Sequence, residues 1–126
     1  MTANTLLNNA LKMLGYSDSD GNTELTARLR NCATVTVNLV YSDLWHICND
    51  GEFVPIKSLF DEIKLPGKAT DEAFVYGLAM HIARSENDGD QQQMFAMLYN
   101  SKRAGLTKYE KVKNAVPRGG DLCDTL

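Results

Sequence analysis

Histidine and cysteine are the residue types in this chain best suited to metal chemistry, so their spacing is considered first. His46 and Cys48 lie two positions apart, but a tetrahedral zinc site needs four ligands, usually in closely spaced pairs. The other candidates, Cys32, His81 and Cys123, are each isolated along the sequence. We therefore expect no metal site. Cys32 and Cys48 are expected to be small buried apolar residues, and His81 a partly buried residue beside an apolar stripe.

Two further patterns suggest ligand binding but lack the residues that would complete a site. Asp18, Asp20 and Gly21 suggest a calcium loop, yet Leu29 stands where an EF-hand has its bidentate Glu. The pair Gly119-Gly120 lacks the Lys and the Ser or Thr of a phosphate-binding loop. We expect neither calcium nor phosphate to bind at these positions.

An acid/base pair is also absent from the sequence pattern. Asp61 and Glu62 are adjacent, and adjacent side chains diverge on any regular element. The methionines at 80, 94 and 97 recur at helical spacing and are interpreted as core residues. With no nucleophile, base or metal cluster, we expect a protein that is not an enzyme and needs no cofactor.

Length and charge favour one small acidic domain with a basic end. The chain has 126 residues and a formal net charge of −3, which argues against general affinity for nucleic acid. Residues 43–90 carry ten acidic and four basic side chains, whereas residues 102–118 carry six basic and one acidic. Such a basic segment suits an acidic partner surface.

Cysteine usage and the N-terminal residues bear on the compartment. Three cysteines without a CxxC pair do not suggest a disulfide framework, so a reducing setting is favoured. The first residues lack the basic and long apolar regions of a signal peptide, and no apolar run approaches the ~20 residues of a membrane span. We expect a soluble protein that is intracellular when made, with no membrane partner.

Hydrophobic periodicity predicts an all-α fold: a small bundle of about four helices over residues 1–106 and an extended C-terminal arm over residues 107–126. The first helix is expected over 4–14, ended by Gly15. The longest is expected over 23–49 and is placed at the centre of the bundle. Its stretch at 33–40 would also suit a strand, so a kink or break near 34–37 is the alternative.

Residues 52–66 contain two prolines and are expected to form a connection of extended segments held down by their own apolar side chains. Residues 70–105 then predict a helical hairpin. Its first stripe is Phe74, Val75, Leu78, Ala79 and Ile82, and its second is Met94, Phe95, Met97 and Leu98, with Tyr99 beside it.

Caps and charges define the ends of the hairpin helices. Thr70 is predicted to cap the first helix and Asp90 the second, with Gly89 at a positive φ between them. Lys102 and Arg103 are expected to complement the dipole at the end of the second helix, which Gly105 terminates.

Several short motifs in this region resemble those of the head–tail connector, or adaptor, proteins of long-tailed bacteriophages and prophages. In that family a DEI-LP linker leads into a YG-A helix, an acidic E-DGD turn and a helix ending in YN-KR. The matching residues are Asp61-Glu62-Ile63 with Leu65-Pro66, Tyr76-Gly77 with Ala79, Glu86 with Asp88-Gly89-Asp90, and Tyr99-Asn100 with Lys102-Arg103. The resemblance covers roughly Leu6 to Arg103.

This resemblance implies a structural virion protein in the phage neck, present in the host cytoplasm during assembly. It implies a homo-oligomeric ring of about twelve copies beneath the portal that docks a stopper or tail-completion protein. DNA would pass through the ring without specific binding, because an acidic protein repels the DNA backbone. The basic arm would contact the portal through Lys108, Tyr109, Lys111, Val112, Lys113, Val116 and Arg118.

An alternative function is a small helical regulatory or host-interaction module that binds a single protein partner. It predicts a monomer or dimer that forms no ring. A helix-turn-helix DNA-binding protein is disfavoured because neither hairpin helix has a basic recognition face.

Overall fold

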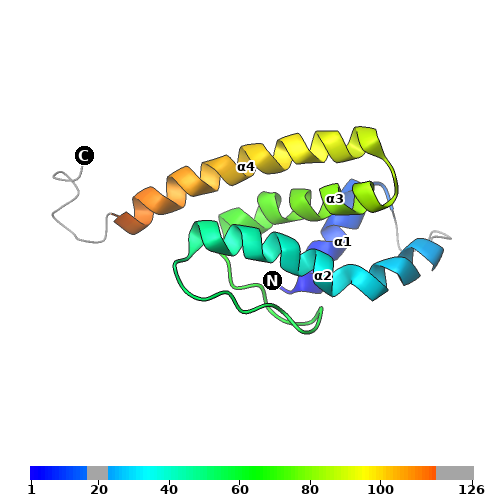
Figure 1. The fold of residues 1–126 in the computed structure, drawn as a ribbon, viewed down its shortest axis with the longest axis horizontal. Coiled ribbons are helices and arrows are strands. Elements are labelled where there is room, and N and C mark those ends of the chain that lie inside the picture. The colour runs from blue at the N-terminus through cyan, green and yellow to red at the C-terminus, as the bar shows by residue number, and fades with distance from the viewer. Residues whose placement is uncertain (17–22, 116–126) are drawn as a thin grey trace.

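In this computed structural model, the described residues form four α-helices and a short π-helical segment. The structure describes residues 1–16 and 23–115, and it gives side-chain surroundings for 1–16, 29 and 31–106. The elements are α1 (Ala3–Met13), α2 (Thr23–Cys48), η1 (Ala69–Ala73), α3 (Phe74–Ser85) and α4 (Gly89–Ala115). No strand occurs among the described residues. The predicted all-α bundle of four helices is confirmed (Figure 1).

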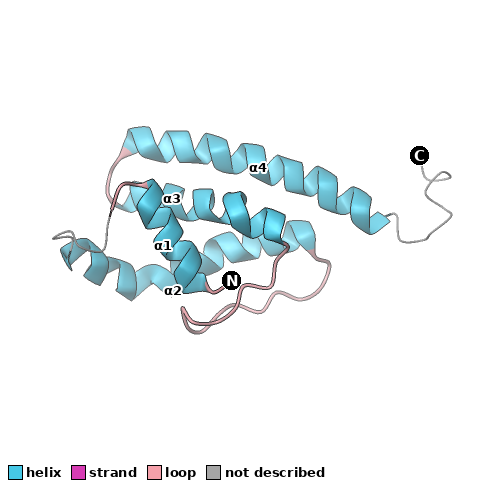
Figure 2. Ribbon diagram, turned by 180° about the vertical axis from the view of Figure 1, so that it is seen from behind, coloured by secondary structure: helices cyan, strands magenta, loops and turns pink. Residues whose placement is uncertain are grey.

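The central helix of the bundle is α3, which packs against each of the other three helices. In Figures 1 and 2 it lies between α2 on one side and α1 on the other, with α4 along one edge. Its buried residues are Phe74, Val75, Gly77, Leu78, Ala79, Ile82 and Ala83. The expectation that the helix over 23–49 is central is wrong, because α2 is buried along one side only over residues 31–48, where its burial is described.

The predicted α1 is confirmed within one residue at each end. The Thr2 hydroxyl accepts a hydrogen bond from the Thr5 N–H at 3.3 Å, which satisfies a first-turn donor. Leu6 and Ala10 are fully buried, and Gly15 follows the helix at φ +92°. The apolar stripe and the terminating glycine therefore specify α1 correctly.

Helix α2 continues through 34–37 without the break considered for this β-branched stretch. Val37, Val40 and Leu44 are almost completely buried, so tertiary packing outweighs the local strand propensity. Helical spacing alone places Val35, Val37 and Leu39 off the main apolar stripe of α2. Val37 is nevertheless buried, whereas Val35 and Leu39 are exposed.

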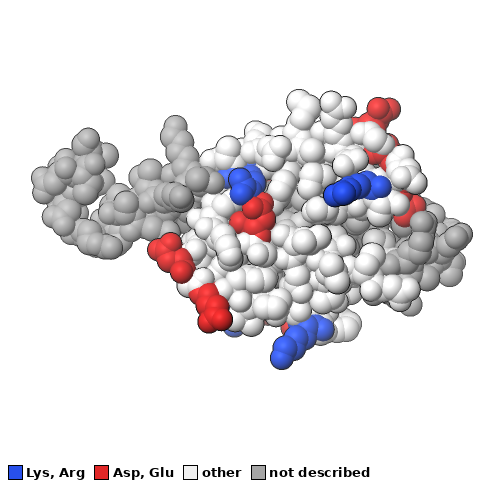
Figure 3. Space-filling model, viewed as in Figure 1, with Lys and Arg blue, Asp and Glu red and all other residues white. Residues whose placement is uncertain are grey.

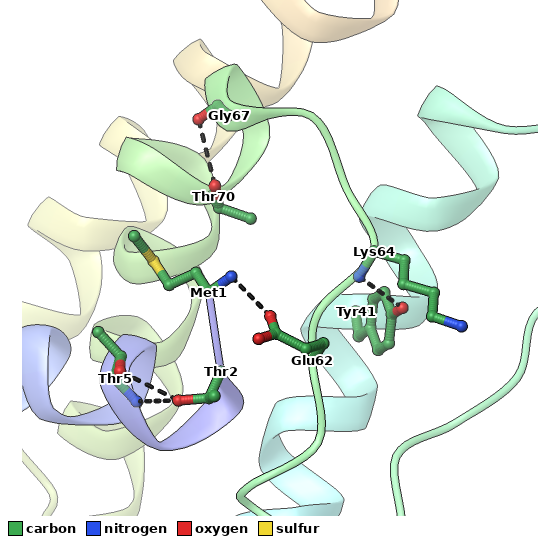
Figure 4. Close-up of polar contacts among 8 residues, drawn as sticks. All are labelled: Met1, Thr2, Thr5, Tyr41, Glu62, Lys64, Gly67 and Thr70. Carbon is green, nitrogen blue, oxygen red and sulfur yellow. Dashed lines mark hydrogen bonds and ion pairs between the residues drawn. The ribbon is translucent and has the colours of Figure 1, made fainter.

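The connection between α2 and η1 is extended as expected and is held at several points by hydrogen bonds. The Asn38 side chain accepts from the Ile56 N–H at 2.9 Å and donates to the Ile56 carbonyl at 3.1 Å. Further along, the Lys64 N–H donates to Tyr41 Oη at 3.0 Å, and the Met1 ammonium lies 2.7 Å from Glu62 Oε2. Figure 4 shows the last two contacts fixing the connection to α2 and to the start of the chain.

The helix preceding Phe74 begins earlier than predicted. Residues 67–68 are already helical and η1 follows, so Thr70 lies inside the helical run. Its hydroxyl donates to the Gly67 carbonyl at 3.3 Å and does not act as an N-cap (Figure 4). The predicted cap is wrong because Thr70 is buried in the second turn.

The turn between α3 and α4 uses different residues from those predicted. Asn87 takes the positive φ, at 58°, and Gly89 is the first residue of α4. The cap is Asp88, whose carboxylate accepts from the Gln91 N–H at 3.1 Å, and not Asp90. The positive φ and the cap therefore both lie two residues earlier than the sequence suggested.

Helix α4 runs through Gly105 to Ala115, so the predicted end at Gly105 is wrong. One glycine in a helix costs only about 1 kcal/mol relative to alanine, and α4 is long enough to absorb that cost. Residues 107–115 thus belong to α4, whose final turns extend past the other helices in Figures 1 and 2. Residues 116–126 of the expected arm lie outside the described residues.

Candidate interaction surfaces

Of the described residues considered for metal chemistry, Cys32, His46 and Cys48 lie on α2 and His81 lies on α3. His46 is exposed near the end of α2, Cys48 is buried and His81 is half-buried on α3. Cys32 is exposed, so its predicted burial is wrong. Among the described residues, no group of three or more His, Cys, Asp or Glu side chains is arranged to hold a metal ion. The calcium candidates Asp18, Asp20 and Gly21 and the residues Cys123, Gly119 and Gly120 lie outside the described residues.

Asp61 and Glu62 diverge as predicted, and each stabilises the connection. Asp61 Oδ2 accepts hydrogen bonds from the backbone N–H groups of Lys57 at 2.9 Å and Ser58 at 3.1 Å. Glu62 pairs with the Met1 ammonium. Both carboxylates therefore have structural roles that account for their presence.

Asp43, Tyr99 and Arg103 form the most elaborate polar cluster among the described residues. The Arg103 guanidinium donates from Nε and Nη2 to the two Asp43 carboxylate oxygens, each at 2.7 Å. The Tyr99 hydroxyl donates to Asp43 Oδ2 at 2.5 Å. This bidentate pair fixes the relative orientation of the two side chains more tightly than a single hydrogen bond would, and it joins α2 to α4.

Electrostatics within this cluster stabilise its charged form. Partial burial raises the pKa of the Asp43 carboxyl, but hydrogen bonds from Arg103 and Tyr99 outweigh burial, so the net pKa lies below 3.8. The hydrogen bond to Asp43 raises the pKa of Arg103. Burial and the carboxylate raise the pKa of Tyr99, which keeps its hydroxyl a donor. The cluster is a structural clasp with no group poised to accept a proton at neutral pH.

Arg103 and Lys102 therefore do not act as end-of-helix charges, because α4 continues beyond them. Lys102 Nζ lies 3.1 Å from Glu72 Oε1 and links α4 to η1. The two charged residues of the YN-KR motif, Lys102 and Arg103, thus hold α4 against η1 and α2. Sequence reasoning missed these partners because they lie about 30 and 60 residues away in the chain.

Gly77, from the YG-A motif, permits close packing of three helices. A Cβ at this position would lie 2.8 Å from Tyr99 Cε1 and 3.0 Å from Val40 Cγ1. Such distances require a neighbour to move. The motif residues Gly77, Asp88, Tyr99 and Arg103 therefore have structural roles: close packing, a helix cap and the clasp with Asp43.

The first candidate interaction surface lies on α2, on the side opposite the core, and we call it the α2 surface. Val35 is 63% exposed and Leu39 is 55% exposed. An open hollow beside them is lined by Val35, Asn38, Leu39, Ser42, Asp43 and His46. Residues 31–42 contain no charged side chain. Figure 3 shows a largely uncharged face over α2.

The second candidate interaction surface lies on the outer side of α4, and we call it the α4 surface. Met94 is 48% exposed and Met97 is 68% exposed, while Phe95 and Tyr99 face the core. The prediction that Met94 and Met97 are core residues is wrong, whereas Met80 packs partly buried against the core. Residues 91–101 contain no charged side chain, which is the sequence signal for this surface.

The connection provides a third exposed apolar group. Val54 is 69% exposed and Phe60 is 79% exposed, so these residues do not hold the connection down as expected. Ile56 and Ile63 of the same connection are buried and do hold it down as expected. The backbone around Phe60 is fixed, because the Leu59 carbonyl accepts from the Asn4 N–H at 2.8 Å.

The predicted portal-binding residues cannot be placed as side chains. Lys108, Tyr109, Lys111, Val112 and Lys113 belong to the backbone of α4, and their surroundings lie outside what the structure describes. Val116 and Arg118 lie beyond the described residues altogether. Their role remains a prediction.

No family model, curated protein or solved structure matches the chain.

None of the helices, over the residues that the structure describes, is long and apolar enough to cross a membrane.

Proposed function

We propose that this protein is a head–tail adaptor of a long-tailed phage or prophage. It assembles as a ring beneath the portal, extends the DNA channel and docks a stopper or tail-completion protein. One observation carries the proposal beyond the motif resemblance. Pairs of large apolar side chains are exposed on α2, on α4 and on the connection that follows α2.

Exposed groups on several elements suit a subunit that has several neighbours. A ring subunit contacts two identical neighbours through different surfaces, and an adaptor also contacts the proteins above and below it. Each apolar group here is small, which a soluble monomer tolerates before assembly. A module for a single partner needs only one of these groups.

The charge distribution also supports this function. The acidic body repels DNA, so a channel built from such subunits lets DNA slide without adhering. The basic residues from Lys108 to Arg118 favour an acidic partner surface, which we assign to the portal.

Native mass measurement tests the proposal most directly. The purified protein is measured alone at increasing concentration, and then with a purified portal ring encoded in the same genome. We expect a stoichiometric ring, either alone or only on the portal, visible as a closed ring by electron microscopy. An unrelated acidic helical protein of similar size serves as the control. A monomer or dimer that ignores the portal would overturn the proposal and favour the module that binds one protein partner.

A further inference from the structure

The α2 surface and the α4 surface have properties that suit them to each other. The α2 surface is a ridge of two branched side chains, Val35 and Leu39, beside an open hollow. The α4 surface presents two flexible thioether side chains, Met94 and Met97. Methionine fills irregular hollows well because it is unbranched and has three rotatable bonds.

Charge supports the same pairing. Residues 31–42 and 91–101 contain no charged side chain, although 23% of the chain is charged. Burying an unpaired charge is the largest cost of most such contacts. Packing these two segments together buries no charged side chain of either segment, so this cost does not arise from them. The surrounding α2 residues Asn38, Ser42, Asp43 and His46 supply a polar border, in which the Asp43 carboxylate is already paired with Arg103.

The two surfaces cannot meet within one chain. Asp43 and Arg103 fix α2 beside α4, while Leu39 and Met97 lie on the sides of these helices that face away from the core. In Figure 1 α2 crosses the front of the molecule and α4 follows its upper edge. A contact between the surfaces therefore needs a second copy of the chain.

We propose that the α2 surface of one copy packs on the α4 surface of the next. This inference rests on the proposed ring, since it names the contact by which neighbouring subunits associate. The contact is heterologous: each copy donates one surface and receives the other, so the arrangement extends until it closes.

The expected strength of the contact follows from its size. At 1.5 Å per residue each uncharged segment is about 17 Å long, and a helix is about 10 Å wide. Such a face is far smaller than the roughly 800 Å² per partner of a stable interface. The contact is therefore weak between isolated copies and becomes effective where other contacts hold the copies side by side.

Charged substitutions at the two centres test the pairing. Leu39→Asp and Met97→Asp place a carboxylate on each surface without disturbing the core, so far-UV circular dichroism and melting should stay as in the parent protein. Sedimentation equilibrium up to about 1 mM should show concentration-dependent association of the parent protein. Each variant alone should associate at least tenfold more weakly. Met13→Asp, which changes an exposed residue of α1, is the matched control and should associate as the parent does.

Mixing the two variants identifies the partner of each surface. Leu39→Asp retains an intact α4 surface and Met97→Asp an intact α2 surface, so an equimolar mixture should form a one-to-one dimer that cannot extend. Association of either variant at the parental level, or a mixture that stays monomeric, would overturn the α2-to-α4 contact. A parent protein that is strictly monomeric at about 1 mM would also overturn it. The adaptor function is judged separately, by binding to the portal, and survives any of these results.

Discussion

At Gly77 the α3 backbone approaches two neighbouring helices too closely for a larger side chain. Tyr99, which would lie nearest to an added Cβ, is buried and hydrogen-bonded to Asp43. Its ring cannot retreat without lengthening that hydrogen bond. The close approach therefore links the packing of α3 to the clasp between α2 and α4.

We predict that Gly77→Ala lowers the free energy of unfolding by about 1–3 kcal/mol, the usual cost of overpacking. The better helix propensity of alanine, about 1 kcal/mol, offsets only part of it. Gly105→Ala is the matched control, since a Cβ at Gly105 has nothing within 4 Å. That variant should be stabilised by up to about 1 kcal/mol. Urea denaturation measures both, and equal effects of the two substitutions would contradict the close approach.

Asp43 makes the strength of the clasp depend on pH. Its folded-state pKa is lowered, so its contribution is fully present above the unfolded value and is lost as pH falls through the folded value. We predict that Asp43→Asn lowers the free energy of unfolding by about 1–2 kcal/mol at neutral pH, allowing for solvent screening of a half-exposed pair. The difference in free energy of unfolding between Asp43→Asn and the parent protein should shrink below pH 3.8.

Chemical denaturation at about pH 7, 5 and 3 follows this difference. Asp50→Asn, at an exposed position after α2, provides a control for removal of a carboxylate. A difference between Asp43→Asn and the parent that stays constant down to the lowest pH would show that the carboxylate charge does not matter.

At the level of elements, periodicity predicts which helices form but not always which side is buried. The stripes of α1 and α3 are correct because each has one continuous apolar side. Helix α4 has two candidate sides, one through Phe95 and Tyr99 and one through Met94 and Met97. Only packing against α3 and η1 decides between them, and this cannot be read from local spacing.

Helix ends were predicted less well, because they depend on small differences between neighbouring residues. Asp88 and Asp90 are both suitable caps, and only the actual turn, with Asn87 at positive φ, selects Asp88. Partners distant in sequence were also beyond prediction. The Asp43–Arg103 pair spans 60 residues, so the motif residues were recognisable but their structural roles were not.

Paired substitutions on α3 and α4 test which sides are buried. Leu78 is completely buried, so Leu78→Ala should lower the free energy of unfolding by about 2–5 kcal/mol. Met97 is 68% exposed, so Met97→Ala should change it by less than about 0.5 kcal/mol in the monomer. Thermal melting of dilute protein distinguishes the two. A large loss of stability in Met97→Ala would show that Met97 is a core residue.

For the molecule as a whole, the described contacts that hold the second half of α4 to the bundle precede the predicted portal-binding residues. Arg103 pairs with Asp43 and Leu106 is 4% exposed, while the predicted portal-binding residues begin at Lys108. The bundle and the basic segment are therefore separable in principle, although α4 runs through both.

We predict that removal of residues 107–126 abolishes association with the portal and leaves the bundle folded. The bundle should survive because the Asp43–Arg103 clasp and the buried Leu106 both lie before the cut. Circular dichroism and melting report the fold, and co-sedimentation with the portal ring reports binding.

A second variant separates the effect of the basic side chains on portal binding from the effect of shortening α4. Replacing Lys108, Lys111 and Lys113 by Gln keeps the full chain but removes three positive charges. It should weaken portal binding, most strongly at low salt, where screening is least. If the Gln variant binds normally while the truncation does not, the contact is made by the residues of the segment that the variant retains, among them Tyr109, Val112, Val116 and Arg118. If the truncation itself binds normally, the portal contact lies on the bundle, and the exposed Phe60 becomes the next residue to test.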